Sequence, residues 1–226
     1  MKAPKREDFA GIDVWVFDLD NTLYPASTNL FAQIDVRMKT YIAQLLNMPL
    51  EDAFKLQKRY YHEYGTSLRG LVLHHGIDPD AFIDHVHDID HSVLNADPRL
   101  DAVLAALPGR KLIYTNGSAY HAESTVKRLG VAHHFDDIFD IRAGDYIPKP
   151  DPAGYAALIA KHAVTPKRAA MFEDSHKNLG PAAALGMKTV WVRHEGLPAH
   201  EGEDISHCHY VTDDLLAWLT ALTDKA

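Results

Sequence analysis

Five short apolar runs, each bounded by charged or turn-forming residues, place the strongest constraint on how this chain can fold. The runs are rich in β-branched and aromatic residues and cover 13–17, 111–114, 138–141, 169–172 and 189–192. Because they do not alternate with polar residues, they suit strands that are covered on both faces, as in a parallel sheet flanked by helices. We therefore predict a parallel β-sheet as the framework of the fold.

The segments between the later runs have the pattern of helices. Residues 119–129 place Ala122, Val126 and Leu129 on one face and are followed by Gly130, which can end a helix. Residues 153–163 and 179–185 behave in the same way. Strands that alternate with helices are typical of a doubly wound α/β fold.

The stretch from about Thr28 to Asp97 differs, because it contains no convincing strand. Two amphipathic helical faces are indicated there, one at Ile34, Met38, Ile42, Leu45 and Leu46 and one at Ala53, Phe54, Gln57, Tyr60 and Tyr61. Prolines near both ends, Pro25 and Pro98, mark the junctions. We predict an α/β core, residues 1–25 and 98–226, interrupted by a helical insert, residues 26–97.

Composition and charge exclude several classes of protein. The 226 residues carry a formal net charge of -8 without a basic stripe, so we expect no nucleic acid polymer as a partner. The first nine residues are highly charged, and no apolar run approaches the 18 or so residues that cross a bilayer. We therefore expect a cytoplasmic protein with no membrane partner.

Cysteine and histidine offer little chemistry in this sequence. Cys208 is the single cysteine, so it cannot form an internal disulfide, and its surroundings do not favour a catalytic thiol. The histidines of the insert lack the zinc-site pattern of a pair four apart with a glutamate: His74, His75, His85, His87 and His91. We expect most of these rings to lie on the surface or to pack within the insert.

Four polar clusters follow the apolar runs, at the carboxyl ends where open parallel sheets bind ligands. They read Asp18-Leu19-Asp20-Asn21-Thr22, Thr115-Asn116-Gly117, Lys149-Pro150 and Glu173-Asp174-Ser175. The clusters supply two carboxylate pairs, a hydroxyl with backbone donors, and a cation. Because none of them contains histidine or cysteine, this all-oxygen environment favours Mg²⁺ bound together with a phosphate group.

The charges of these clusters suit phosphoryl transfer to or from a small phosphorylated substrate. Two like charges 4 Å apart repel each other by about 4 kcal/mol at an effective dielectric of about 20, so a carboxylate needs help to approach a phosphate. Mg²⁺ and Lys149 would offset that repulsion, while Thr115 and Asn116 could hold the equatorial oxygens. Of the pair Asp18 and Asp20, one could attack phosphorus while the other transfers a proton, whether they point the same way or diverge.

In combination these motifs resemble the haloacid dehalogenase (HAD) superfamily of aspartate-dependent phosphatases. The resemblance covers four ordered motifs from Asp18 to Asn178, with the insert in the position of that family's helical cap. It implies a Rossmann-like sheet of strand order 3-2-1-4-5, with the nucleophile at Asp18 and the acid/base at Asp20. It also implies Mg²⁺ held by Asp18, the Asp20 backbone carbonyl and Asp174, and phosphate contacts from Thr115, Asn116 and Lys149.

One motif departs from the family's pattern. Asn178 lies four residues after Asp174, where some relatives have another acid. We expect Glu173, Ser175 and Asn178 to support the metal from outside its direct ligands. Within the superfamily, the segments 17–25, 172–175 and 178–179 look most like the pyrimidine 5′-nucleotidase group, which implies nucleoside monophosphates such as UMP or CMP as substrates.

Other functions remain open at this point. A sugar phosphomutase of the same architecture, a dehalogenase and a non-catalytic partner-binding domain are the alternatives. Each cluster also has a purely structural alternative: a capping pair at Asp18 and Asp20, a turn and helix cap at 115–118, an exposed loop lysine at Lys149, and a solvated strand end at Glu173-Asp174. Within the insert, Arg37, Arg59 and Arg69 are available for substrate selection.

Overall fold

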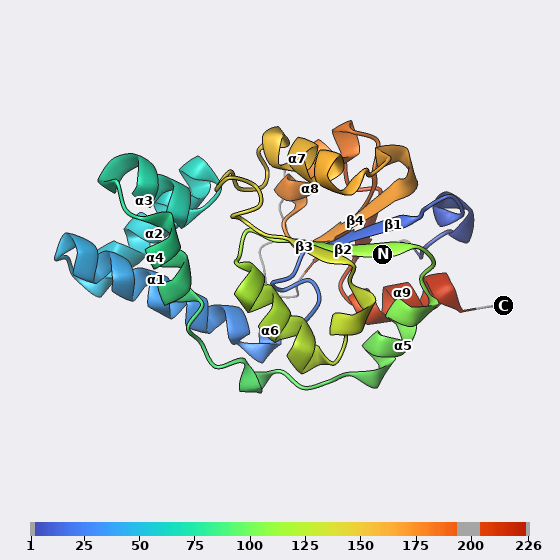
Figure 1. Ribbon diagram of the computed structural model, residues 1–226, viewed down its shortest axis with the longest axis horizontal. Helices are drawn as coiled ribbons and strands as arrows, with labels where there is room; N and C mark the ends of the chain where they lie inside the picture. Colours follow the sequence, from blue (N-terminus) through green and yellow to red (C-terminus); the bar gives the residue numbers. More distant parts are fainter. Residues whose placement is uncertain (1–2, 194–203, 225–226) are drawn as a thin grey trace.

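A six-stranded parallel sheet forms the centre of the computed structural model, which describes residues 3–193 and 204–224 (Figure 1). Its strands are β1 (Val14–Phe17), β2 (Arg110–Tyr114), β3 (Asp137–Phe139), β4 (Ala169–Glu173), β5 (Lys188–Val192) and β6 (Tyr210–Thr212). The strand order is β3-β2-β1-β4-β5-β6, and every pairing is parallel. The predicted parallel α/β fold and the order of its first five strands are confirmed, and β1 lies inside the sheet.

The sixth strand was not predicted. β6 has three residues and pairs with β5 at the edge of the sheet, where Val190 lies opposite Tyr210. So short a run shows no usable periodicity in the sequence, yet the ring of Tyr210 is buried among Phe9 and Trp218. Packing around this aromatic residue therefore holds an edge strand that local sequence does not indicate.

Helices cover both faces of the sheet, as required by strands whose apolar residues do not alternate with polar ones. They are α5 (Pro98–Ala106), α6 (Ala119–Leu129) and α9 (Leu215–Thr223) on one face, and α7 (Pro152–His162) and α8 (His176–Ala184) on the other (Figure 1). Each face has its own apolar core, one around Trp15, Phe17 and Phe172 and the other around Val16 and Met171. α6 has the predicted bounds, whereas α8 begins three residues before the predicted position.

The chain between β1 and α5 forms a separate group of helices beside the sheet (Figure 1). These are α1 (Leu30–Leu46), α2 (Leu50–Tyr64), α3 (Ser67–His75) and α4 (Pro79–Val86). Short 3-10 helices occur at Arg6–Phe9, Ala26–Thr28, His91–Val93, Ala132–His134 and Pro166–Arg168. The described residues of the insert contain no strand, and the division at residues 26 and 97 stays a prediction.

The predicted apolar faces of the insert are only partly right. Ile34, Ile42 and Tyr60 lie in its apolar cluster with Phe82 of α4. In contrast, Leu45, Phe54 and Tyr61 are 41%, 42% and 48% exposed. Helical periodicity indicates which residues share a face, but it does not say how far along that face a neighbouring helix reaches.

Exposed ion pairs connect the insert to the loop that follows β3. Arg142 Nε lies 2.6 Å from Asp80 Oδ1, and Arg142 Nη2 lies 2.8 Å from Asp84 Oδ1, both on α4. Tyr146 of the same loop donates a hydrogen bond to Asp80. Near these contacts, Ile141 is buried in the apolar cluster of the insert. The insert and the sheet are thus joined by charges at the surface and by a small apolar contact beneath them.

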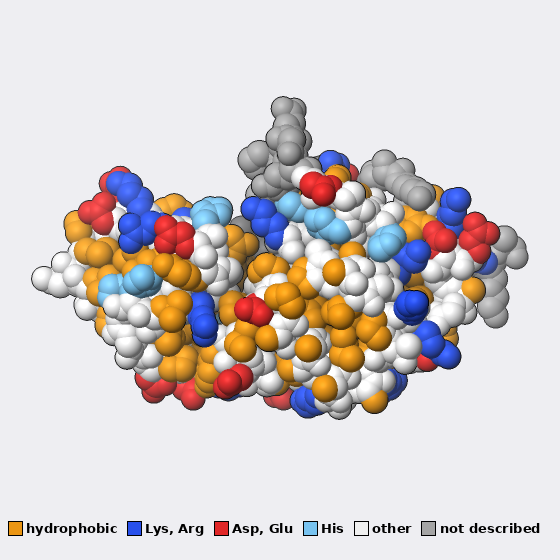
Figure 2. Space-filling view, turned by 90° about the horizontal axis from the view of Figure 1, so that it is seen from above, with side chains coloured by type: hydrophobic (Ala, Val, Ile, Leu, Met, Phe, Trp, Pro, Cys, Tyr) orange, Lys and Arg blue, Asp and Glu red, His pale blue; other side chains and the backbone are white. Residues whose placement is uncertain are grey.

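The expectations about partners stay predictions. On the face shown in Figure 2, lysine and arginine side chains are dispersed among acidic and apolar ones. Within residues 3–193 and 204–224, no helix is both long enough and apolar enough to cross a bilayer.

Gly109, which leads into β2, is a point where the backbone leaves no room for a side chain. Its φ is +83°, and a Cβ there would lie 2.3 Å from the Asp13 carbonyl oxygen, which accepts the Arg110 N–H at the start of the β1–β2 pairing. We expect Gly109→Ala to lower the free energy of unfolding by about 2–4 kcal/mol, through backbone strain and steric overlap. Urea denaturation followed by circular dichroism measures this.

Gly11→Ala is the matched control, because a Cβ at Gly11 meets nothing within 4 Å. Its effect should stay within about 0.5 kcal/mol. Equal stabilities of the two variants would contradict this account of the β1–β2 connection.

Candidate active site

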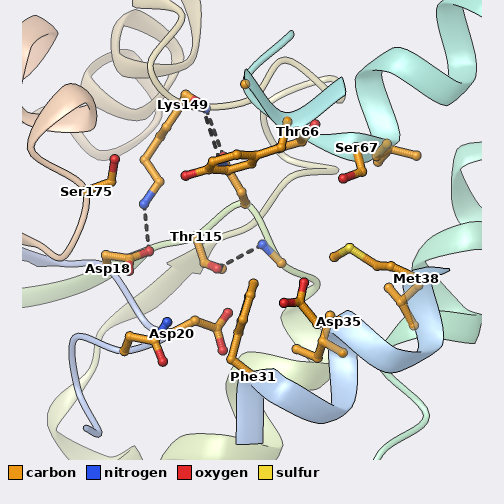
Figure 3. Close-up of a pocket in the computed structure, with 18 of the residues that line it drawn as sticks. Asp18, Asp20, Phe31, Asp35, Met38, Thr66, Ser67, Thr115, Lys149 and Ser175 are labelled. Atoms are coloured by element: carbon orange, nitrogen blue, oxygen red, sulfur yellow. Dashed lines mark hydrogen bonds and ion pairs between the residues drawn. The ribbon is translucent and has the colours of Figure 1, made fainter. Parts of the chain in front are cut away.

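A cavity of about 330 Å³ lies beyond the carboxyl ends of β1, β2 and β4, between the sheet and the insert (Figure 3). Its lining includes every site residue predicted from the sequence: Asp18, Asp20, Thr115, Asn116, Lys149, Glu173, Asp174, Ser175 and Asn178. Because β1, β2 and β4 are neighbours in parallel register, the polar residues that follow them meet at one edge of the sheet. The structure therefore brings the predicted residues together, while their roles stay predictions.

Lys149 is the charged centre of this site. Its Nζ lies 2.7 Å from Asp18 Oδ1, 2.7 Å from Glu173 Oε2 and 2.8 Å from the Tyr114 carbonyl oxygen. The side chains of Lys149 and Glu173 are 1% and 2% exposed. The alternatives of an exposed loop lysine and of a solvated strand end at Glu173 are therefore wrong. All three N–H bonds of the ammonium group are directed to oxygen.

Burial shifts the pKa values of this cluster. It raises the pKa of Asp18 to about 7, the charge of Glu173 adds to the rise, and Lys149 opposes both. Burial likewise raises the pKa of Glu173 and of Asp174 to about 7. Burial alone would lower the pKa of Lys149, but the charges of Asp18 and Glu173 raise it above its ordinary value. The cluster thus has more carboxylates than its single cation can balance.

The carboxylates fit a hard divalent cation. One oxygen each from Asp18, Glu173 and Asp174 lies within 4.8 Å of the others, and all are oxygen donors. Two of them, Asp18 and Asp174, belong to the ligand set expected from the sequence. The third, Glu173, bonds Lys149 through one oxygen and accepts the Ser175 N–H with the other, and its supporting position stays a prediction.

Asp20 has two partners that the sequence analysis missed. Tyr24 and His121 both donate hydrogen bonds to its Oδ1, and the distance to His121 Nε2 is 2.7 Å. Burial alone would raise the pKa of Asp20, but the charge and hydrogen bond of His121 and the hydroxyl of Tyr24 lower it below the ordinary value. Asp18 instead accepts a hydrogen bond from Thr22 at 3.2 Å and from Lys149, so the two aspartates have separate partners.

The sequence carries only weak signals for Tyr24 and His121. Tyr24 lies four residues after Asp20, in a non-helical turn whose geometry the sequence does not reveal. His121 lies in the first turn of α6, three residues after Ser118, whose hydroxyl caps the helix by accepting the His121 N–H at 3.2 Å. Because α6 starts directly after the polar cluster at 115–117, its first turn necessarily faces the same edge of the sheet as that cluster.

Thr115 and Asn116 have structural partners inside the site. Thr115 Oγ1 accepts the Gly117 N–H at 2.9 Å. The side chain of Asn116 bonds the backbone of Lys149, accepting its N–H at 2.8 Å and donating to its carbonyl oxygen at 3.3 Å. The predicted turn and helix cap at 115–118 is thus present, and Asn116 also holds the Lys149 loop in place.

Two insert histidines are exceptions to the expectation that most of these rings lie on the surface or pack within the insert. His74 and His75 are exposed as expected, but His87 and His91 are buried against α6. The ring of His87 stacks on that of His121 with centroids 4.8 Å apart, and His91 Nε2 lies 3.0 Å from His121 Nδ1. Burial, followed by the proximity of His121, lowers the pKa of His87 to about 3, so this ring is neutral.

Cys208 has the environment of a structural cysteine. It is half-buried and packs against the apolar core beneath α7 and α8. Burial raises the pKa of its thiol to about 11, with a smaller contribution from Asp204. A nucleophilic cysteine requires the opposite shift.

The insert supplies the wall of the cavity opposite Asp18 (Figure 3). Phe31, Asp35 and Met38 reach the cavity from α1, and Thr66 and Ser67 from the start of α3. The three arginines considered for substrate selection are not among its lining residues. Arg37 bonds the His85 carbonyl and Asp88, and Arg59 lies over the Tyr60 ring. Arg69 lines a neighbouring cavity.

This fold and site define an α/β protein with a carboxylate and lysine centre at the carboxyl ends of its parallel strands. A family model described as haloacid dehalogenase-like hydrolase matches residues 12–186. The chain therefore belongs to the haloacid dehalogenase-like hydrolases, and the predicted superfamily is confirmed.

Relatives with assigned names are also similar to this chain. Phosphate metabolism protein 8 of Saccharomyces cerevisiae is 30% identical over 194 residues, which are 78% of this chain and 60% of that protein. The chain thus spans less than two thirds of the length of this relative. Glyceraldehyde 3-phosphate phosphatase of Methanopyrus kandleri is 26% identical over 199 residues, 79% of this chain and 82% of the relative.

A solved structure supports the fold independently. The HAD phosphatase from Thermococcus onnurineus superposes with a TM-score of 0.61 at 19% identity, covering 92% of this chain and 96% of its own. At this level of identity the comparison shows the shared fold alone.

The Lys149 cluster gives a prediction about stability. At pH 8, replacement of Lys149 by Met leaves both Asp18 and Glu173 buried without their cation. We expect Lys149→Met, measured without divalent metal, to lower the free energy of unfolding by about 3–5 kcal/mol. The double variant with Glu173→Gln should recover part of this loss, because one of the two uncompensated charges is then removed.

Lys161→Met is the control, because Lys161 pairs with Asp137 at 3.0 Å with both side chains nearly half exposed. Its effect should stay below about 1 kcal/mol. Similar losses in the two single variants would refute a special role for the buried cation.

Proposed function

We propose that this protein is a Mg²⁺-dependent phosphomonoester hydrolase that works through an aspartyl-phosphate at Asp18. One observation carries the proposal: Asp18 and Asp20 line the same cavity, the first paired with the buried Lys149 and the second held by Tyr24 and His121. Two aspartates with different partners suit two different tasks. Membership of the hydrolase family and the phosphatase name of one relative support this chemistry.

The proposed reaction has two halves. Asp18 attacks phosphorus, the bond from phosphorus to the leaving oxygen breaks, and Asp20 gives a proton to that oxygen. Water then attacks the phosphorus of the aspartyl-phosphate, Asp20 takes a proton from that water, and the bond to Asp18 breaks to release inorganic phosphate. In the free protein the lowered pKa of Asp20 keeps it ionised, and an arriving phosphate dianion increases its affinity for the proton.

The remaining groups hold the phosphoryl group. Asp18, Asp174 and the backbone carbonyl of Asp20 would hold Mg²⁺, which neutralises charge on the phosphate when it is bound. Lys149 offsets the charge of Asp18, with its Nζ 2.7 Å from Asp18 Oδ1. The Thr115 hydroxyl and Asn116 donate to the phosphoryl oxygens in this proposal.

We propose nucleoside monophosphates, pyrimidine ones in particular, as the substrate class. The resemblance of the motif segments to the pyrimidine 5′-nucleotidase group suggests them. The insert side of the cavity agrees with a leaving group that has an apolar body, because Phe31, Ile34, Met38 and Phe82 line it.

The alternatives fit less well. A phosphomutase that depends on a bisphosphate needs a second anion site, yet the lysines among the described lining residues, Lys58 and Lys149, are both paired with carboxylates. A dehalogenase has little use for a proton donor at Asp20, because halide leaves without a proton. A non-catalytic partner-binding domain has no need for the assembled cavity.

Replacement of the two aspartates tests the catalytic assignment. Asp18→Asn should reduce phosphate release to the background rate, because the nucleophile is lost. Asp20→Asn should lower kcat by about 10²–10⁴-fold, the range for loss of an acid/base group. The measurement is phosphate release from nucleoside monophosphates, sugar phosphates and small phosphoacids, together with rapid-quench mass spectrometry of the peptide that contains Asp18.

Asp52→Asn serves as the control, because Asp52 is exposed on α2 away from the cavity. A phosphorylated peptide that lacks Asp18, or equal rates in Asp18→Asn and the wild type, would refute the assignment.

Removal of metal tests the cofactor. Excess EDTA should stop phosphate release, and Mg²⁺ in excess over the chelator should restore it. Mg²⁺ should also raise the Tm of the wild type more than that of Asp174→Asn, since bound metal stabilises the folded state. Full activity in excess EDTA would exclude the proposed metal requirement.

A further inference from the structure

The carboxylate of Asp20 is held from one side only. Tyr24 and His121 both donate to the same oxygen, Oδ1, while Oδ2 has no hydrogen-bond donor among the described residues. The side chain of Asp20 is 15% exposed and belongs to the lining of the cavity that contains Asp18. A carboxylate bonded through a single oxygen presents its other oxygen to whatever occupies the cavity.

His121 is itself fixed on every side. Its side chain is fully buried, its Nδ1 lies 3.0 Å from His91 Nε2, and its ring stacks on His87 with an angle of 5° between the planes. His87 in turn bonds Ser118 Oγ at 3.0 Å, the same hydroxyl that caps α6 at His121. Because an ionised carboxylate can only accept, the Nε2 of His121 must carry the proton of the bond to Asp20.

Three parts of the chain therefore determine where His121 lies. His87 follows α4 of the insert, His91 begins a 3-10 helix before α5, and His121 belongs to α6 beside the sheet. Residues that serve only to fill space do not require this alignment of ring nitrogens and hydroxyls. The arrangement instead directs His121, which bonds His91 and stacks on His87, towards one oxygen of one carboxylate.

We propose that His121 is a positioning residue for Asp20, with Tyr24 as its partner, and that together they fix Oδ2 as the oxygen that exchanges protons with the substrate. The inference rests on the proposed phosphomonoester hydrolysis. When the bond from phosphorus to the leaving oxygen breaks, the proton on Oδ2 moves to that oxygen and Asp20 becomes a carboxylate. In the second half, Oδ2 takes a proton from the attacking water.

The proposal predicts that the effect of replacing His121 depends on the leaving group of the substrate. 4-Nitrophenolate leaves without needing a proton, whereas an alkoxide does not leave unless it receives one. The ratio kcat/KM reports the reaction up to the first irreversible step, which here is the transfer to Asp18. A misdirected Asp20 therefore lowers kcat/KM for an alkyl phosphate and leaves that for 4-nitrophenyl phosphate almost unchanged. Loss of folding or of phosphate binding lowers both.

The experiment compares wild type, His121→Phe, His121→Gln and Tyr24→Phe with n-butyl phosphate and 4-nitrophenyl phosphate. We expect His121→Phe to lower kcat/KM for n-butyl phosphate about 10- to 100-fold and for 4-nitrophenyl phosphate less than about 3-fold. His121→Gln keeps an N–H within reach of Asp20 and should recover most of the loss. Tyr24→Phe removes the other donor without disturbing the histidines and should show the same selectivity, which keeps the test valid if His121→Phe does not fold.

His162→Phe is the control, because His162 is a partly buried histidine that packs on Phe139 and does not line the cavity. It should leave both kcat/KM values within about 2-fold of wild type. Equal losses for both substrates in His121→Phe and Tyr24→Phe, or no loss for either, would overturn the positioning role. If the wild type hydrolyses neither ester nor any other monoester, the proposed function fails instead, so the two failures are distinguishable.

Discussion

The ion pairs of Lys149 with Asp18 and Glu173 are the constraint on which the rest of this site depends. They join the ends of β1 and β4 to a loop that is held against β2 by Asn116. Three carboxylates lie within reach of one another, and only a fully buried ammonium group makes their proximity tolerable. The parallel sheet sets these groups side by side, and their mutual charges then determine what the cavity can bind.

Much of this arrangement could be predicted from the sequence because parallel sheets obey a simple rule. Unalternating apolar runs indicate buried strands, and the polar residues just after them meet at one edge. That rule placed Asp18, Thr115, Lys149 and Asp174 at the same cavity without knowledge of any contact. The order of the strands did not follow from composition or periodicity and came from the resemblance to a family.

The remainder depends on contacts between distant segments, which local patterns do not encode. β6 is held by Tyr210 in a core formed by residues far away in the sequence. The bond from His121 to Asp20 spans 101 positions, and the sequence does not say which partner a histidine in a first helical turn takes. The positions of residues were predicted correctly where they follow from secondary structure. They were missed where they depend on contacts between side chains of distant segments.

The ion pairs between Arg142 and α4 have a consequence for how the molecule responds to its solution. They are exposed at the surface, so dissolved ions compete with them and weaken them over distances of about 8–10 Å at ordinary salt concentrations. The contribution of these ion pairs to the attraction between the insert and the sheet therefore declines as ionic strength rises. The buried charges at Lys149 are shielded from the same ions, so the two sets of ion pairs respond to salt in different ways.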